Sequence, residues 1–314
     1  MARFLLQRIA LMIPTIFFVS VIVFSLQQLL PGDPALTMAG DEASPAVIAE
    51  IRAKFHLDDP LLIRYGKWIA DLAHGDLGIS LRTQQSVVQL LSQKVPVTLE
   101  LATLAMVIAL TFGVSMGILA AIWRGGIVDY VARGVALFGI SMPSFWLGIL
   151  FILLFSVKWR ILPASGSVSL MEDPVENLRS MIMPATVLGL AVSGVIMRHT
   201  RSAMLQVLSN DYVRTARAKG LKETTVVFIH ALRNAALPII TLGALEFGQL
   251  LSGTVLTETV FSIPGFGKLV VDAVFNRDYA VVQGAVLCTA LVFLMLNLLA
   301  DLAYAVVNPR LRSQ

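Results

Sequence analysis

The sequence predicts an all-α membrane protein with six transmembrane helices and a helical insertion between the first and the second. Of its 314 residues 57% are hydrophobic and only 14% are charged, which is too apolar for a soluble domain of average composition. Six apolar windows approach or exceed the length of about 20 residues that a helix needs to cross a bilayer. Backbone groups inside a bilayer must be hydrogen-bonded within the chain, so we expect these windows to be helices.

The six windows divide the chain unevenly. They cover residues 9–30, 101–123, 134–157, 181–197, 235–257 and 279–300. The fourth is short, and we expect its helix to continue through the basic segment 198–208. Only the fifth contains a charged residue, Glu246. An ionisable residue inside a span is costly and is a candidate for a role in transport.

The distribution of Lys and Arg predicts the orientation in the membrane. If the N-terminus is cytoplasmic, the inner segments hold thirteen Lys and Arg residues and the two short outer loops hold five. Short loops rich in these residues remain in the cytoplasm. Both termini are therefore predicted to be cytoplasmic. The net charge of +4 then reflects membrane topology, and no motif indicates a nucleic-acid partner.

Three regions are predicted along the chain. Residues 1–30 form an N-terminal transmembrane helix, residues 31–96 an external helical insertion, and residues 97–314 a core with five transmembrane helices and a cytoplasmic loop at 205–234. Within the insertion, Ser44-Pro45 and Asp59-Pro60 each precede an apolar stripe with helical spacing, as at a helix start. These helices either pack on the rim of the bundle or receive something that arrives from outside.

The chain lacks the common motifs of catalysis. It has no GxxxxGK[ST], HExxH or GxSxG sequence, and its four His residues are scattered over different segments. The single cysteine, Cys288, cannot form an internal disulfide or a thiolate cluster. We therefore expect no enzyme activity, no metal site and no cofactor bound by this chain. If it moves a solute uphill, the energy must come from another subunit or from an ion gradient.

A basic segment, residues 210–238, separates two strongly apolar windows. Asn210 and Asp211 are suited to cap a helix that ends at Gly220, because glycine adopts the left-handed conformation common after a helix. A second helix is expected to run on toward Pro238. Such an element is suited to contact a soluble motor, and it is equally compatible with a basic helix that lies on anionic lipid.

Here the residues resemble a known family. The run YVRTARAKG at 212–220, followed by HALRNAALP at 230–238, resembles the cytoplasmic signature loop of ATP-binding-cassette (ABC) importer permeases, in the form found in the dipeptide, oligopeptide, glutathione and nickel branch. The chain departs from the general Glu-Ala-Ala-x-x-x-Gly form at Arg214 and Thr215. Further stretches resemble these permeases in the same order, namely 30–34 (LPGDP), 141–145 (SMPSF), 261–267 (FSIPGFG), 277–284 (RDYAVVQG) and 308–309 (NP).

The resemblance implies a function and a set of partners. The chain would be one half of the pore of an ATP-driven importer in a bacterial inner membrane, carrying short peptides or a related small solute. Its partners would be a second permease, two cytoplasmic ATPase subunits that bind ATP and Mg, and an external substrate-binding protein. The resemblance implies that the following residues couple the permease to the ATPase: Asp211, Tyr212, Arg214, Thr215, Ala216, Arg217, Lys219 and Gly220.

The cargo and the pathway remain open at this level. Glu246 and Gln249 are candidates to line the pathway, although Glu246 is equally suited to a structural contact between helices. The alternative function is an ion-coupled secondary transporter that depends on Glu246 and works without ATPase subunits. For the importer, we expect Gly220→Asp to leave the protein in the membrane but to abolish transport, because a larger residue strains the turn by about 1 kcal/mol.

Overall fold

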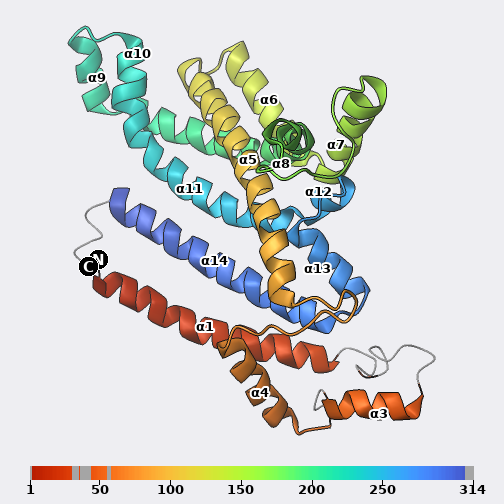
Figure 1. Cartoon of the computed structure of the whole chain (residues 1–314). Coiled ribbons are helices and arrows are strands. Elements are labelled where there is room, and N and C mark those ends of the chain that lie inside the picture. The colour runs from red at the N-terminus through yellow and green to blue at the C-terminus, as the bar shows by residue number, and fades with distance from the viewer. Residues whose placement is uncertain (1, 30–34, 36–43, 55–57, 308–314) are drawn as a thin grey trace. The chain divides into compact units, whose positions relative to one another are not determined.

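The computed structural model describes residues 2–29, 35, 44–54 and 58–307. Most of these residues are helical, apart from connecting segments, such as 159–173, and one isolated bridge between Ile79 and Ser86. The helices, shown in Figure 1, divide into two compact units. The first unit is Met1–Val95 with Leu269–Met295, and the second is Pro96–Lys268 with Leu296–Gln314. Each unit is described by itself below.

The first unit begins with α1 (Ala2–Leu29) and contains α3 (Pro45–Lys54) and α4 (Leu61–Ala73), which lie in the predicted insertion. Both helices of the insertion begin where the sequence predicted. The α4 helix packs on α1. The ring centroids of Tyr65 and Trp68, on α4, lie 5.4 and 5.7 Å from the ring centroid of Phe24, on α1. The Tyr65 hydroxyl also forms a 2.8 Å hydrogen bond with Ser20. The apolar stripe of α4 thus lies partly against a predicted membrane helix.

The remaining elements of the first unit come from both ends of the chain. They are the first turns of α5 (Val87–Ile122), most of α13 (Phe266–Phe275) and the first part of α14 (Tyr279–Val307). The approach of α5 to α14 requires a glycine, since a Cβ on Gly284 would lie 2.5 Å from Val87 Cγ1. Segments almost 200 residues apart in sequence are therefore in contact.

The second unit contains the other helices. They are the rest of α5, then α6 (Ile127–Ser141), α7 (Ser144–Phe151) with a π-helical continuation Ile152–Lys158, α8 (Pro174–Leu208), α9 (Asp211–Ala218), α10 (Glu223–Thr225), a π-helical segment Val226–Ala231, α11 (Leu232–Gly253) and α12 (Val255–Val260). Small residues allow close packing of α5 on α8. A Cβ on Gly113 would lie 2.8 Å from the Ser193 carbonyl oxygen, and one on Gly189 would lie 2.8 Å from that of Ala105.

Four of the described helices are long and apolar enough to cross a membrane. They are Val87–Ile122, Pro174–Leu208, Glu223–Leu251 and Tyr279–Leu299. In α1 the shorter stretch Ala10–Ser25 is apolar. The prediction that the fourth span continues through 198–208 is confirmed, and the helical class is confirmed, whereas the count of six spans is not.

The predicted third span, 134–157, is not one straight helix. Its helices Ile127–Ser141 and Ser144–Lys158 are bent by 101° at residues 142–143. Pro143 is the cause, because the residue before a proline avoids helical geometry and Met142 is extended at φ −80°, ψ 128°. The expectation of a single helix was wrong, and the pair counts as a fifth span only as a broken one.

Candidate coupling site

The α9 helix, Asp211–Ala218, forms where the sequence predicted a short helix. Asn210 is extended and occupies the position before the helix, but its side chain makes no capping hydrogen bond, so that part of the prediction was wrong. At the other end Gly220 has φ +77°, and its backbone N–H donates to the Arg217 carbonyl at 2.9 Å. The prediction of a left-handed glycine that ends the helix is confirmed.

One face of α9 is buried. Val213 is fully buried, and together with Ala216 it packs against Val226, Val207 and Leu208. The helix is thereby fixed on the end of α8 and on the π-helical segment that precedes α11. Ala216 was predicted to couple to the ATPase, but its side chain lies on this inner face.

The opposite face of α9 is exposed and cationic. The other seven predicted coupling residues are exposed: Asp211, Tyr212, Arg214, Thr215, Arg217, Lys219 and Gly220. Arg214 Nη1 lies 3.4 Å from Asp211 Oδ1, and this ion pair contributes little to stability because both side chains are exposed. In the described part of the chain, the Lys219 and Lys222 side chains have no ion-pair partner. Their charges are therefore available to a partner.

Two pairs of side chains tie α9 to the segments after it. Arg217 Nε and Nη2 donate to the Glu223 carboxylate at 3.1 and 2.5 Å, across the Gly220 turn. These hydrogen bonds raise the pKa of the Arg217 guanidinium above its usual value, so its charge is permanent. The Asn234 side chain donates to the Tyr212 hydroxyl at 2.9 Å and thus connects α9 with α11.

Sequence reasoning missed Glu223 and Asn234 as members of this site. Asn234 lies inside the HALRNAALP motif, so its position was visible, but its bond to Tyr212 depends on how two helices meet. The intervening Val226–Ala231 segment is π-helical. Such segments are uncommon and frequently mark functional positions.

The candidate pathway residues lie elsewhere. Glu246 and Gln249 are on α11, and Glu246 is about three turns beyond Asn234. Glu246 is partly buried and Gln249 is exposed. The structure does not bring either residue into the coupling site, so they would act separately from it.

In the second unit the short amphipathic helix α9 lies between the long apolar helices α8 and α11. Two structures of the methionine transporter MetNI in inward-facing conformations share this fold, with TM-scores of 0.57 and 0.58. Each covers 70% of this chain and 97% of the other, at 16 and 17% sequence identity. At this identity the similarity shows the fold alone.

The family follows from the sequence. Residues 113–313 match the binding-protein-dependent transport system inner membrane component family, and residues 1–102 match its N-terminal region. The chain belongs to this family, and it is a multi-pass inner membrane permease.

Several curated relatives match along the whole chain. The dipeptide transport system permease protein DppB of Escherichia coli K12 is 44% identical over 99% of both chains. The di/tripeptide transport system permease protein DppB of Pseudomonas aeruginosa UCBPP-PA14 is 43% identical over 100% of both. A putative peptide transport system permease protein of Brucella abortus 2308 is 42% identical over 99% of both.

Proposed function

We propose that the chain forms one half of the pore of an ATP-driven importer for short peptides, and that an ATPase subunit binds the exposed face of α9. The observation that carries the proposal is the construction of α9. Val213 and Ala216 anchor one face, while Arg214, Lys219 and the Gly220 turn are presented on the other. The relatives named as peptide permeases, at 42 to 44% identity over the full chain, support the peptide class of substrate.

The mechanism follows from the attachments of α9. When ATP binding closes the two ATPase subunits, a force on α9 passes to α8 through the Val213 contacts and to α11 through the Tyr212–Asn234 hydrogen bond. Both α8 and α11 are long apolar helices that would line or support the pore. A movement of α9 would therefore shift both helices and change the opening of the pore. ATP and Mg bind to the ATPase subunits. A second permease completes the pore, and an external binding protein delivers the peptide.

The Gly220 turn provides a test. A Cβ atom at Gly220 would meet no atom within 4 Å, so the positive φ of this residue is what opposes substitution by a β-branched residue. We expect Gly220→Val to strain the turn by about 1–2 kcal/mol, whereas Gly220→Asn is tolerated because asparagine adopts this conformation more readily. In complexes purified in mild detergent, Gly220→Val should recover less ATPase subunit and lose peptide uptake, and Gly220→Asn should retain both.

Full uptake and normal ATPase recovery by Gly220→Val would contradict the proposal, because α9 would then not couple the permease to the ATPase subunit. Uptake by the chain without any ATPase subunit, abolished by Glu246→Gln, would identify an ion-coupled transporter instead. Glu246 is the residue for this second test because it is an ionisable residue partly buried within an apolar helix.

A further inference from the structure

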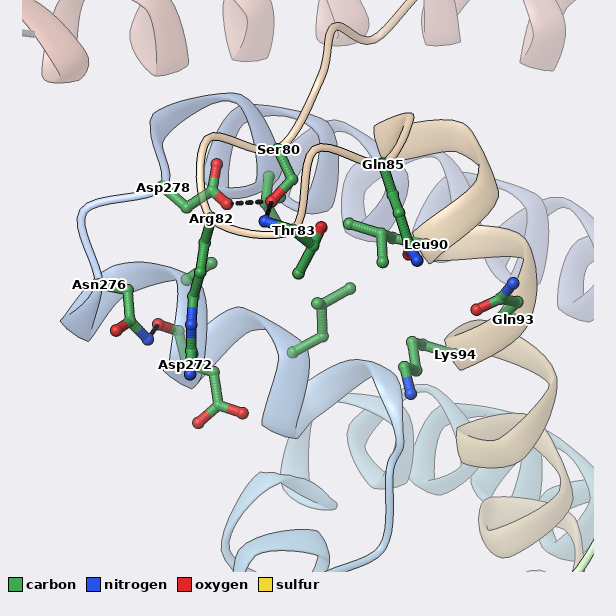
Figure 2. Close-up of a pocket in the computed structure, with 13 residues that line it drawn as sticks. Ser80, Arg82, Thr83, Gln85, Leu90, Gln93, Lys94, Asp272, Asn276 and Asp278 are labelled. Atoms are coloured by element: carbon green, nitrogen blue, oxygen red, sulfur yellow. Dashed lines mark hydrogen bonds between the residues drawn. The ribbon is translucent and has the colours of Figure 1, made fainter. Parts of the chain in front are cut away.

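A cavity of about 290 Å³, lined by both polar and apolar side chains, lies within the first unit. Its walls come from the loop before α5, the first turns of α5, the end of α13 and the start of α14. Figure 2 shows the side chains that surround it. By the predicted topology this cavity is on the external side of the membrane.

The wall of the cavity is held in place by a buried carboxylate. Asp278 accepts hydrogen bonds from the Ser80 hydroxyl at 2.5 Å and from the Leu81 backbone N–H at 3.3 Å. Ser80 Oγ in turn accepts from the Thr83 backbone N–H at 3.0 Å. Asp278 is only 4% exposed, so these bonds are shielded from water. The loop is therefore ordered before a ligand arrives, which lowers the entropic cost of binding.

Charges of both signs face the cavity without ion-pair partners. Arg82, Lys94 and Asp272 line it, and none of them has a salt bridge in the described residues. In Figure 2 Lys94 is on one side of the hollow, on α5, and Arg82 and Asp272 are on the other. A ligand with one charge would satisfy only part of this lining, whereas a ligand with both charges can pair with groups of each sign.

The uncharged lining suits an amide. Gln85 and Gln93 present side-chain amides, the Asn276 amide donates to the Asp272 carbonyl oxygen, and the buried Leu90 and Val281 provide apolar surface. The volume is near the lower end of the range of small-molecule sites, about 300–1,000 Å³, so it holds one or two amino-acid residues. A metal ion is not favoured, because the described residues contain no group of three His, Cys, Asp or Glu suited to hold one.

We propose that this cavity binds a small zwitterion of the peptide type. Lys94 pairs with the carboxylate, and Asp272, on the other side of the cavity, pairs with the protonated amino group. The inference rests on the proposed function, since it supplies an entry site on the permease for the released peptide. Substrate selection at this cavity would then depend on the charged amino and carboxylate groups at the two ends of the peptide.

The experiment measures direct binding of L-alanyl-L-alanine to the purified complex without its binding protein, by saturation-transfer NMR. Lys94→Gln and Asp272→Asn should each weaken binding about tenfold, equivalent to about 1.4 kcal/mol for one charge pair. Lys67→Gln and Asp71→Asn, on the exposed surface of α4, are the matched controls and should bind as the wild type does. Size exclusion and thermal unfolding verify that each variant is folded.

A chemical control separates recognition of the termini from a structural effect. N-acetylation of the peptide removes the charge that Asp272 recognises, so Asp272→Asn should bind the free and the acetylated peptide equally. The wild type should prefer the free peptide. Equal binding of both peptides by the wild type, or unchanged binding in Lys94→Gln and Asp272→Asn, would overturn the inference.

Uptake by the same preparations, reconstituted with the binding protein and ATP, separates the two proposals. If the wild type imports L-alanyl-L-alanine but does not bind it at this cavity, the cavity is not a substrate site, and the proposed importer function still stands. Binding that depends on Lys94 and Asp272, in a complex that does not import the peptide, would refute the proposed importer and retain the site.

Discussion

Glu258 shows how a single residue organises the second unit. It is fully buried, and its carboxyl oxygens accept from the Thr98 hydroxyl at 2.6 Å and from the Lys268 backbone N–H at 2.8 Å. Thr98 Oγ1 also accepts from the Phe266 backbone N–H at 2.8 Å. The network therefore joins α5, α12 and the start of α13.

The same network explains the glycines of the FSIPGFG stretch. A Cβ on Gly265 would overlap the Glu258 carboxyl group, and one on Gly267 would lie 2.9 Å from the Val255 Cα atom. The Val255 backbone cannot move aside as a flexible side chain does. The motif thus needs glycine at these positions for close packing.

We expect Glu258→Gln to lower the free energy of unfolding by about 2–3 kcal/mol, because the amide replaces one acceptor oxygen with a donor and leaves buried partners unsatisfied. Thermal unfolding of the purified protein measures the effect. Glu172→Gln, an exposed glutamate in the α7–α8 connection, is the control and should change little. Equal melting temperatures for the two variants would contradict the role assigned to Glu258.

At the scale of helices, α6 and α8 are joined both by close packing and by a buried ion pair. A Cβ on Gly194 would lie 2.6 Å from the Ala136 carbonyl oxygen. At one end of the contact, Arg201 donates from Nε and Nη2 to the two oxygens of Asp129, at 2.8 Å each. Asp129 also accepts from the Gly125 backbone N–H at 2.9 Å and is 1% exposed.

Removal of the bidentate partner should destabilise the protein. We expect Arg201→Gln to lower the melting temperature, because it removes both hydrogen bonds to Asp129 and leaves that carboxylate with Arg133, whose Nε lies 3.1 Å from Asp129 Oδ1. Arg179→Gln removes an exposed arginine that pairs with Glu176 and should cost about 0–1 kcal/mol. The comparison is made by thermal unfolding, and a loss in Arg179→Gln as large as that in Arg201→Gln would argue against a specific role for the buried pair.

At the scale of the whole molecule, the predicted orientation places the coupling loop in the cytoplasm and the start of α5 outside. Lys222 and Gln89 are exposed positions in these two regions. In a background that carries Cys288→Ala, we expect a membrane-impermeant thiol reagent added to intact cells to label Gln89→Cys and not Lys222→Cys.

Inside-out vesicles provide the complementary measurement for this orientation. There, Lys222→Cys should be labelled and Gln89→Cys should be protected. Labelling of Lys222→Cys from the outside of intact cells would invert the topology and place the coupling helix on the wrong side for a cytoplasmic ATPase.

Much of the coupling site was predictable because it depends on local chemistry. A run of small and basic residues favours a short amphipathic helix, and the left-handed turn at Gly220 reflects a backbone preference of glycine itself. The break at Pro143 was also a local signal, but hydropathy alone concealed it within one apolar window. The burial of Ala216 could not be predicted, because it depends on the position of Val226 in another segment.

By itself, the sequence determined the helical class, the membrane setting and the position of the short helix α9, since apolar run length and residue preference act over a few turns. Only the tertiary structure decided which distant groups meet. Asp129 pairs with Arg201 across 72 residues, Thr98 with Glu258 across 160, and Ser80 with Asp278 across 198. No local pattern encodes such pairs, because a buried polar group gains its partner only when the helices that carry the two residues pack together.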